Sequence, residues 1–422
     1  MRKIKITPLL ALIFHIPFLY GLAFCYADSV KVGGTVESFS AAYSREASDS
    51  KEGQLFTEIR ILPTLTVFYS DQYLFYLEGD IRQDTAGLAH GYINGFGENT
   101  GERWAVNVRE GYGELNEKWL RIRAGKQVYD WSVTDSISPS DNISPRDWTD
   151  IIRNERIGVP SLDVRLGYDS YVQIVYIPLF SPSKLPVAGS RWERSLPPGL
   201  VNEEQEIVSG DSGQFAVRAG HVWNGFDLGV SFFKGYGYSP SFKLEAVSAT
   251  KTGLIPVYRR EEVFAASLAK EISGYTLRSE IGYFNQDKDD NFVQGVVGID
   301  REWGDIFQYT DSLYILLQYV NEVKTQDDNP VGFETIDFRR IFNNAILGKV
   351  AYSFDDRKTW KVKLTGVYNI SDHDSYIEPA VNWNKFNFNI EAGANVMSGH
   401  RDTFFGGYSH NDRFFIRMTY QF

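Results

Sequence analysis

The chain has 422 residues, of which 43% are hydrophobic and 15% aromatic, with one cysteine and a formal net charge of −11. The negative charge argues against nucleic acid as a partner. Beyond the amino-terminal segment, no stretch approaches the roughly 18 consecutive apolar residues of a transmembrane helix. A chain of this length could form two soluble domains or one large barrel. The aromatic content favours a membrane β-barrel, whose interfacial girdles need Tyr, Trp and Phe.

Residues 1–27 have the features of a secretory signal peptide. A positively charged segment comes first and contains Arg2, Lys3 and Lys5. An apolar segment follows over residues 8–24, and Ala27 precedes the expected cleavage site. Because the only cysteine is Cys25, the mature chain has no thiol, no disulfide and no cysteine metal site. Removing the segment takes the formal charge from −11 to −14.

From residue 28 onward one unit repeats: an alternating run, a tight polar turn, a second alternating run and a longer polar loop. Strict alternation gives each strand one apolar and one polar face. We predict strands over 29–42, 54–69, 72–83, 103–115, 118–128, 161–168, 171–180, 212–223, 225–237, 261–272, 274–286, 291–303, 310–324, 341–355, 358–370, 373–384, 386–398 and 410–422. Eighteen is an even number, as single-chain bacterial barrels usually have. The predicted fold is therefore all-β: residues 28–422 form a single transmembrane antiparallel β-barrel.

The connections between these strands alternate in length. The long ones include 129–160, 181–211, 238–260, 325–340 and 399–409, whereas two connections in the same series, at 287–290 and 371–372, are short. Short periplasmic turns and long extracellular loops are typical of outer-membrane barrels. Aromatic residues cluster near the short turns, which predicts a belt at headgroup depth. They are Tyr69, Tyr73, Trp119, Tyr168, Tyr171, Trp223, Phe226, Tyr275, Phe354, Trp360, Trp383 and Phe386.

The last strand carries the strongest single signal. Its apolar phase consists of Phe414, Ile416, Met418, Tyr420 and Phe422. A closed barrel needs such a strand to pair with its first strand. A terminal aromatic with Tyr two positions before it resembles the terminal signature of Gram-negative outer-membrane proteins. That resemblance implies an outer-membrane location, contact with lipid and lipopolysaccharide, and recognition of Phe422 by the barrel-assembly machinery.

If the apolar phase of each strand faces lipid, the other phase lines the lumen. Turning an Arg or Lys toward mid-membrane lipid costs about 2–4 kcal/mol, so the charged residues of the strands must face water. Eleven basic and six acidic residues belong to this set: Glu78, Asp80, Arg82, Arg121, Arg123, Asp163, Arg165, Arg218, Arg278, Glu280, Lys349, Lys361, Lys363, Glu378, Glu391, Arg413 and Arg417. Adjacent Arg109 and Glu110 can both face inward only if a β-bulge resets the phase.

Five of the inward arginines come from strands three to eight and could form a basic track on one wall. They are Arg82, Arg121, Arg123, Arg165 and Arg218. Such a track would offer anions an attractive path. The alternative is that these side chains pair with inward acids and merely close the barrel interior.

Residues 120–151 form the densest motif of the chain. The phrase Ile-Ser-Pro-x-Asp occurs twice, at 137–141 and 143–147. Proline fixes φ and an Asp two positions later can cap a turn, so loop 129–160 is predicted to be ordered. We expect it to fold into the lumen and to form a constriction with Trp131 and the acids Asp135, Asp141, Asp147 and Asp150. The alternative is a cap lying over the mouth.

This block resembles the equivalent block in a family of Gram-negative outer-membrane barrels that is related in pattern to the alginate-export-type porins. Their pattern runs Leu-Arg-x-Gly-Arg-Gln, then Trp-Gly, then Asn-Pro-x-Asp. The matching positions are Leu120, Arg121 or Arg123, Gly125, Lys126, Gln127, Trp131, Pro145 and Asp147; the departures are Lys126 for Arg, Ser132 for Gly and Ser144 for Asn. The resemblance implies a monomeric, porin-like channel of eighteen strands.

The predicted function is an outer-membrane porin-like channel for passive diffusion of small hydrophilic, anionic solutes, with no enzymatic activity, cofactor or metal. One alternative is a receptor or adhesin that acts through its outer loops while its lumen is plugged. Another is a rim protease using Asp372, His373 and Asp374. The protease is disfavoured because no second carboxylate pair can be placed opposite. The scattered histidines lack metal-ligand spacing.

Overall fold

The computed structural model describes residues 27–46, 50–91, 103–135, 137–194, 200–202, 213–248, 251–287, 289–327 and 338–422. The expected signal peptide lies outside these ranges, except for Ala27. No helix among the residues described is long and apolar enough to cross a membrane.

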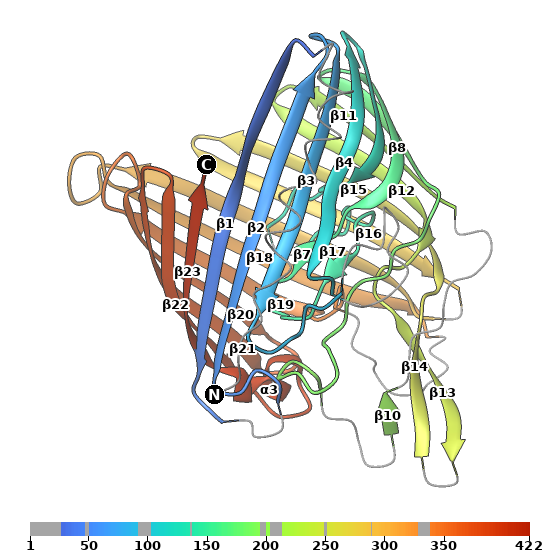
Figure 1. The fold of residues 1–422 in the computed structure, drawn as a ribbon, viewed down its shortest axis with the longest axis vertical. Coiled ribbons are helices and arrows are strands. Elements are labelled where there is room, and N and C mark those ends of the chain that lie inside the picture. Colours follow the sequence, from blue (N-terminus) through green and yellow to red (C-terminus); the bar gives the residue numbers. More distant parts are fainter. Residues whose placement is uncertain are drawn as a thin grey trace.

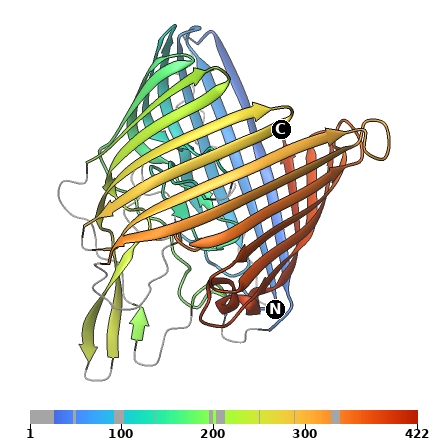
Figure 2. The ribbon, with the colours of Figure 1, turned by 180° about the vertical axis from the view of Figure 1, so that it is seen from behind.

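Eighteen antiparallel strands form one closed cylinder, seen from two sides in Figures 1 and 2. They are β1 (Ser29–Tyr43), β2 (Leu55–Phe68), β3 (Tyr73–Asp84), β4 (Val106–Glu117), β5 (Leu120–Gln127), β8 (Val159–Gly167), β9 (Ser170–Ile177), β11 (Gln214–Trp223), β12 (Phe226–Tyr236), β15 (Arg260–Ile272), β16 (Tyr275–Gln286), β17 (Asn291–Gly304), β18 (Ser312–Gln326), β19 (Asn344–Ser353), β20 (Trp360–Asn369), β21 (Asp374–Lys385), β22 (Phe388–Ser398) and β23 (Arg413–Gln421). The predicted barrel of eighteen strands is confirmed.

The cylinder closes where the last strand meets the first. β23 pairs with β1 from Thr35 opposite Gln421 to Tyr43 opposite Arg413. Beyond β23, Phe422 donates its N–H to the carbonyl of Gly34 at 3.0 Å and accepts the Gly34 N–H at 3.1 Å. No edge strand is left open in the barrel, as a membrane-spanning sheet requires.

Tight turns at one rim fix the register of the hairpins. Asn224 and Gly225 both have positive φ (49° and 74°), as have Ser273 and Gly274 (52° and 80°). Two central residues with positive φ give the two-residue turn whose twist matches that of the flanking strands. The asparagine and glycines therefore stand where the turn geometry needs them.

The outer face of the barrel is apolar. Exposed side chains at alternate strand positions include Val230, Phe264, Ile281, Val297, Leu317, Leu364 and Phe414. Trp119, Trp223, Trp360 and Phe386 are exposed beside the short turns. A closed sheet with this surface matches a hydrocarbon surrounding. Tyr171 departs from the predicted belt: it faces inward, where the guanidinium of Arg165 lies 3.7 Å from its ring centroid.

A bulge resets the phase of β4. Glu78 is paired with Glu110 and the next residue, Gly79, with Val108, so Arg109 is skipped in the register. Nη1 of Arg109 lies 3.0 Å from Oε1 of Glu78, and Glu110 accepts the backbone N–H of Val128 at 2.7 Å. Both charges of the adjacent pair thus have partners on the inner side.

Several shorter elements lie in the long loops. At the lower end of Figure 1, β10 (Leu200–Asn202), β13 (Ser241–Ser248) and β14 (Lys251–Val257) form a separate three-stranded sheet. β6 (Arg146–Asp147) pairs with β7 (Glu155–Arg156) in the loop after β5. Helix α3 (Phe404–Gly407) precedes β23. None of these elements was predicted.

Candidate permeation site

The connection between β5 and β8, residues 128–158, contacts opposite walls of the barrel. Its residue Ser138 bonds Glu280 on β16, and its residue Glu155 pairs with Arg60 on β2. Counted along the paired strands, β16 is nine steps from β2 in a cylinder of eighteen. The loop therefore crosses the lumen between these walls.

On the β16 wall, Glu280 organises the first half of the loop. Its carboxylate is almost fully buried and accepts five hydrogen bonds from loop residues. The donors are the backbone N–H groups of Val133 (2.6 Å), Thr134 (2.7 Å) and Ser140 (3.1 Å) and the hydroxyls of Thr134 (2.9 Å) and Ser138 (2.6 Å). A buried carboxylate is stable only with such compensation. The Glu280 carboxylate therefore fixes the first half of the loop against β16.

An apolar area of the inner wall holds the same half of the loop. Tyr129, Trp131 and Ile143 are buried in one cluster with Val175, Ile177, Ala216, Phe233, Val263, Phe284 and Phe292 of the strands. These strand residues occupy the inward phase, where a solvated pore would need polar side chains. The loop covers them, and the burial of apolar surface stabilises its position.

On the β2 and β3 wall, ion pairs hold the second half of the loop. Arg60 contacts Asp80 at 2.7 Å and Glu155 at 2.9 Å. Arg82 pairs with the same two acids, at 3.1 Å from Glu155, and its Nη1 lies 3.7 Å from Asp147. Two wall arginines thus alternate with one wall acid and two loop acids, which balances most of the buried charge.

Two further contacts extend this attachment around the barrel. Glu58 on β2 binds Arg153 of the loop at 2.9 Å and Arg103 at 2.8 Å. Arg413 on β23 binds Asp150 of the loop at 2.7 Å. Burial alone would raise the pKa of Asp150, but Arg413 outweighs it and holds that pKa below its ordinary value. Asp150 therefore stays charged and tied to β23.

The repeated Ile-Ser-Pro-x-Asp phrase supplies the internal order of the loop. Asp141 accepts the backbone N–H of Trp131 at 3.2 Å and pairs with Arg156 at 2.7 Å. Asp147 accepts the backbone N–H of Thr149 at 3.1 Å and its hydroxyl at 2.6 Å. Asp147 thus caps a turn after Pro145, as the motif predicts, whereas the side chain of Asp141 binds residues that are distant in the sequence.

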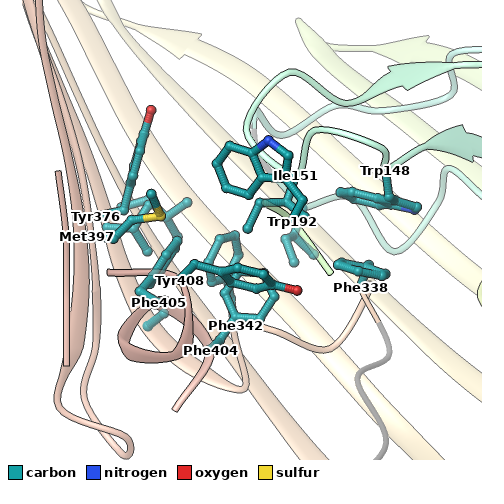
Figure 3. Close-up of a cluster of buried hydrophobic side chains, with 14 of the residues drawn as sticks. Trp148, Ile151, Trp192, Phe338, Phe342, Tyr376, Met397, Phe404, Phe405 and Tyr408 are labelled. Atoms are coloured by element: carbon teal, nitrogen blue, oxygen red, sulfur yellow. The ribbon is translucent and has the colours of Figure 1, made fainter. Parts of the chain in front are cut away.

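Aromatic residues from four loops fill the space against β21 and β22 (Figure 3). Trp148 comes from the loop that crosses the lumen, Trp192 from the next long loop, Phe338 and Phe342 from the β18–β19 loop, and Phe404, Phe405 and Tyr408 from the β22–β23 loop. Trp148 stacks on Phe338 with ring centroids 4.7 Å apart, and Phe342 stacks on Phe405 at 6.0 Å. This aromatic cluster packs on Tyr376 and Met397 of the barrel wall.

A row of basic side chains lies on the far side of the barrel from the aromatic cluster. In the ladder Arg121 pairs with Arg165, Arg165 with Gln173, and Gln173 with Arg218. Like charges directly opposite are destabilising in a sheet, so this arrangement needs a compensating reason. Arg121 lies 3.7 Å from Asp163, whereas no ion pair of Arg165 or Arg218 occurs within the described part of the chain.

The predicted site residues separate into distinct groups. Arg121 and Arg123 lie on β5, Arg165 on β8 and Arg218 on β11; Arg123 pairs with Glu114, and Arg218 donates to the carbonyl oxygen of Trp131 at 3.1 Å. Arg82 does not belong with them, because it is buried in the ion pairs with Asp80 and Glu155. The five predicted arginines therefore do not form one group, since Arg82 lies among the ion pairs of the β2 and β3 wall. Sequence reasoning missed Arg60, Arg153 and Glu155.

The predicted constriction acids also differ from one another. Asp141, Asp147 and Asp150 are bound by arginines and are not open to a passing solute. Asp135 is about half exposed and contacts Gln318 at 3.2 Å and Arg278 at 3.9 Å. Beside it opens a cavity of about 390 Å³, lined by Asp130, Ser132, Val133, Thr134, Asp135, Ser138, Arg146, Arg156 and Arg278.

The residues considered for a rim protease have structural contacts. Asp374 is buried, accepts the backbone N–H of Phe405 at 2.7 Å and the amide of Asn369 at 2.8 Å, and so anchors α3. His373 has positive φ and contacts the Tyr368 hydroxyl at 3.1 Å. Within the described ranges no group of three or more His, Cys, Asp or Glu could hold a metal ion.

Comparison with known proteins gives likeness in fold without likeness in sequence. No family model and no curated protein matches the chain. Among solved structures, the BenF-like porin of Pseudomonas fluorescens is similar at 9% identity and a TM-score of 0.55, covering 94% of this chain and 99% of its own. OccD3 of Pseudomonas aeruginosa has 9% identity and a TM-score of 0.53, with 94% and 92% covered. OccAB1 of Acinetobacter baumannii has 10% identity and a TM-score of 0.51, with 94% and 96% covered.

These likenesses support the predicted architecture but not the predicted family. The similar structures are Occ-type and BenF-like porins, and the expected relation to alginate-export-type porins is not supported. The chain has the fold of Gram-negative outer-membrane porins, a closed barrel of eighteen antiparallel strands.

Proposed function

We propose that the protein is an outer-membrane channel for passive diffusion of small hydrophilic, anionic solutes. The row Arg121, Arg165, Gln173 and Arg218 carries the proposal, because it places three guanidinium groups on one inward strip. Arginine can hold a carboxylate through two parallel hydrogen bonds. A strip of such groups raises the local concentration of anions and so their rate of entry.

The loop at residues 129–160 is the proposed constriction. It lies across the lumen between β2 and β16, and the aromatic cluster fills the side near β21 and β22. The remaining path then passes between the loop and the basic row, where Arg218 touches the loop at Trp131. On the loop side Asp130 is paired with Arg156 and Asp135 lies beside Arg278, so these acids are balanced by arginines and the basic row supplies the charge that would attract anions.

Reversal potentials in planar bilayers test the proposal. With a potassium chloride gradient, the native channel should favour chloride over potassium. The combined change Arg121→Gln, Arg165→Gln and Arg218→Gln should reduce that preference. Arg301→Gln is the matched control, since Arg301 stacks on Tyr275 and Trp303 and belongs to the outward phase of β17. Equal chloride and potassium permeability in the native channel would contradict anion selectivity.

Liposome swelling extends the test to organic solutes. Gluconate should enter faster than glucose, which lacks the carboxylate, at the same concentration and osmolarity. The triple arginine variant should lose this difference while glucose entry stays similar. Equal entry rates of gluconate and glucose into the native channel would contradict the proposed role of the basic row. The protein would then be an unselective channel.

A receptor or adhesin is the second candidate, and the aromatic cluster favours it. Four loops pack together there, as they would in a barrel whose lumen is plugged and whose outer surface is the working part. Bilayer conductance separates the two candidates. A folded protein that inserts but carries no current would support the receptor and contradict the channel.

Assembly and location belong to the same proposal. A signal peptide at residues 1–27 would direct export, and Phe422 would be recognised by the barrel-assembly machinery before the β1–β23 seam closes. Lipid and lipopolysaccharide would then surround the apolar outer face. Amino-terminal sequencing of the protein from outer membranes tests the first step: a mature chain that begins at Asp28 is expected.

A further inference from the structure

The connection between β17 and β18, residues 305–311, is the longest on the short-turn rim. Its apolar side chains point into open space: Phe307 is 80% exposed, Tyr309 86% and Ile306 37%. A contiguous group of exposed apolar side chains is typical of a site that contacts a partner or a membrane.

Two carboxylates hold this turn in a fixed shape. Asp311 accepts the backbone N–H groups of Ile306 (2.6 Å), Phe307 (2.9 Å) and Gln308 (3.0 Å). Asp305 accepts the backbone N–H of Thr310 at 2.7 Å. Thr310 has a φ of 74°, which is unfavourable for a β-branched residue and is held by the surrounding contacts. The exposed aromatics are therefore presented by an ordered turn.

The turn is attached to the lipid side of the rim. Tyr352 of β19 donates its hydroxyl to Asp311, and the Tyr352 ring lies 5.7 Å from that of Phe307. Tyr352 shares the outward phase of β19 with the exposed Ile346 and Val350. The side-chain amide of Gln308 donates to the carbonyl of Phe354 at 2.7 Å. These contacts place the turn beside the apolar outer face and away from the lumen.

We propose that turn 305–311 is a membrane anchor, which inserts Phe307 and Tyr309 into the headgroup layer of the adjoining lipid leaflet. The occupant is lipid because the turn continues the lipid-facing aromatic surface formed by Phe354 and Trp360. Aromatic rings are stable at the boundary between hydrocarbon and water. The anchor would fix the depth of the barrel on this side.

A nitroxide label at position 307 tests the anchor. In a Cys25→Ser background the full chain has no thiol, so Phe307→Cys can be labelled at one site. The labelled barrel is placed in phosphatidylcholine vesicles, and relaxation by oxygen and by a water-soluble nickel complex is measured. Asp169→Cys, in the polar turn between β8 and β9, is the matched control. Heat-modifiable mobility on a denaturing gel verifies that each labelled barrel is folded.

The expected result is that the label at 307 is shielded from the nickel complex several-fold more than the label at 169. Asp311→Ala in the 307-labelled chain should reduce the shielding and increase label mobility, because three backbone donors lose their acceptor. Equal nickel accessibility at 307 and 169 would overturn the proposal. Dipolar broadening between labels would overturn it as well, since a second copy of the chain would then be the occupant.

Discussion

At the scale of single residues, Glu280 shows how a charge can be buried in a channel wall. Its carboxylate replaces water with five donors of one loop, so the wall and the loop stabilise each other. The acids of the other half of the loop are compensated by arginines instead. The two halves of the loop therefore depend on different kinds of contact and should respond differently to substitution.

We predict that Glu280→Gln weakens loop docking by about 2 kcal/mol, because a neutral amide is a poorer acceptor and brings two donors of its own. A change of that size shifts the ratio of docked to released loop by roughly thirtyfold. Single-channel recordings should show frequent excursions to a higher conductance. Glu302→Gln is the control, since Glu302 is exposed at the rim and its partners among the described residues are Lys358 and Ser312. If neither variant shows excursions to a higher conductance, the proposed role of Glu280 is contradicted.

We also predict that acidification to pH 5 leaves the loop docked. Burial would raise the pKa values of Asp147 and Glu155, but Arg103 and Arg82 outweigh it for Asp147, and Arg60 and Arg82 for Glu155, so both values are lowered. The stabilisation is complete above the ordinary carboxyl pKa of about 4 and is lost only as pH falls through the lower folded values. Asp141 has the opposite effect on docking as pH falls, because burial raises its pKa. Conductance measured from pH 7 to 5 should stay constant. A steep rise in that range would contradict the claim that these ion pairs keep the loop docked.

At the scale of elements, the sequence predicts each barrel strand but not the inner surface of several of them. Period-two alternation gives eighteen strands because lipid and water impose opposite demands on successive residues. Residues 174–177 violate the alternation, since Val175 and Ile177 are apolar on the inward phase. Apolar residues on the inward phase of a strand indicate, from the sequence alone, that a loop covers that part of the wall. The ion pairs of Arg82 could not be predicted, since their partners Asp147 and Glu155 are placed by tertiary packing.

The loop between β5 and β8 gives a prediction at this scale. Replacing residues 132–142 with a short Gly-Ser linker removes the segment held by Glu280 and should increase single-channel conductance. The ion pairs of Arg60 and Arg82 with Glu155 remain, so the barrel wall is expected to stay intact. A matched shortening in the outer hairpin of β13 and β14 should leave conductance unchanged. If the first variant also conducts like the native channel, the loop does not constrict the pore.

At the scale of the whole molecule, closure depends on the seam between β1 and β23. The chain ends at this seam, and the terminal residue Phe422 exchanges two backbone hydrogen bonds with Gly34. The seam joins residues from the two ends of the barrel domain, so its formation costs more loop-closure entropy than that of any hairpin. A defect there should affect assembly more than a similar defect within a hairpin.

Gly34→Val is predicted to impair closure of the barrel. A Cβ at position 34 would lie 2.6 Å from the carbonyl oxygen of Leu62 and 2.8 Å from the ring of Phe422. Overpacking of this kind costs about 1–3 kcal/mol, and part of the clash is with backbone that cannot move away. Gly113→Val is the matched control, because a Cβ on this strand glycine meets no atom within 4 Å. Folding yield in lipid vesicles, read as heat-modifiable gel mobility, should fall for Gly34→Val and stay near the native value for Gly113→Val. Equal yields would mean that the seam tolerates displacement of Phe422, and closure would then depend on the pairing of β1 with β23 alone.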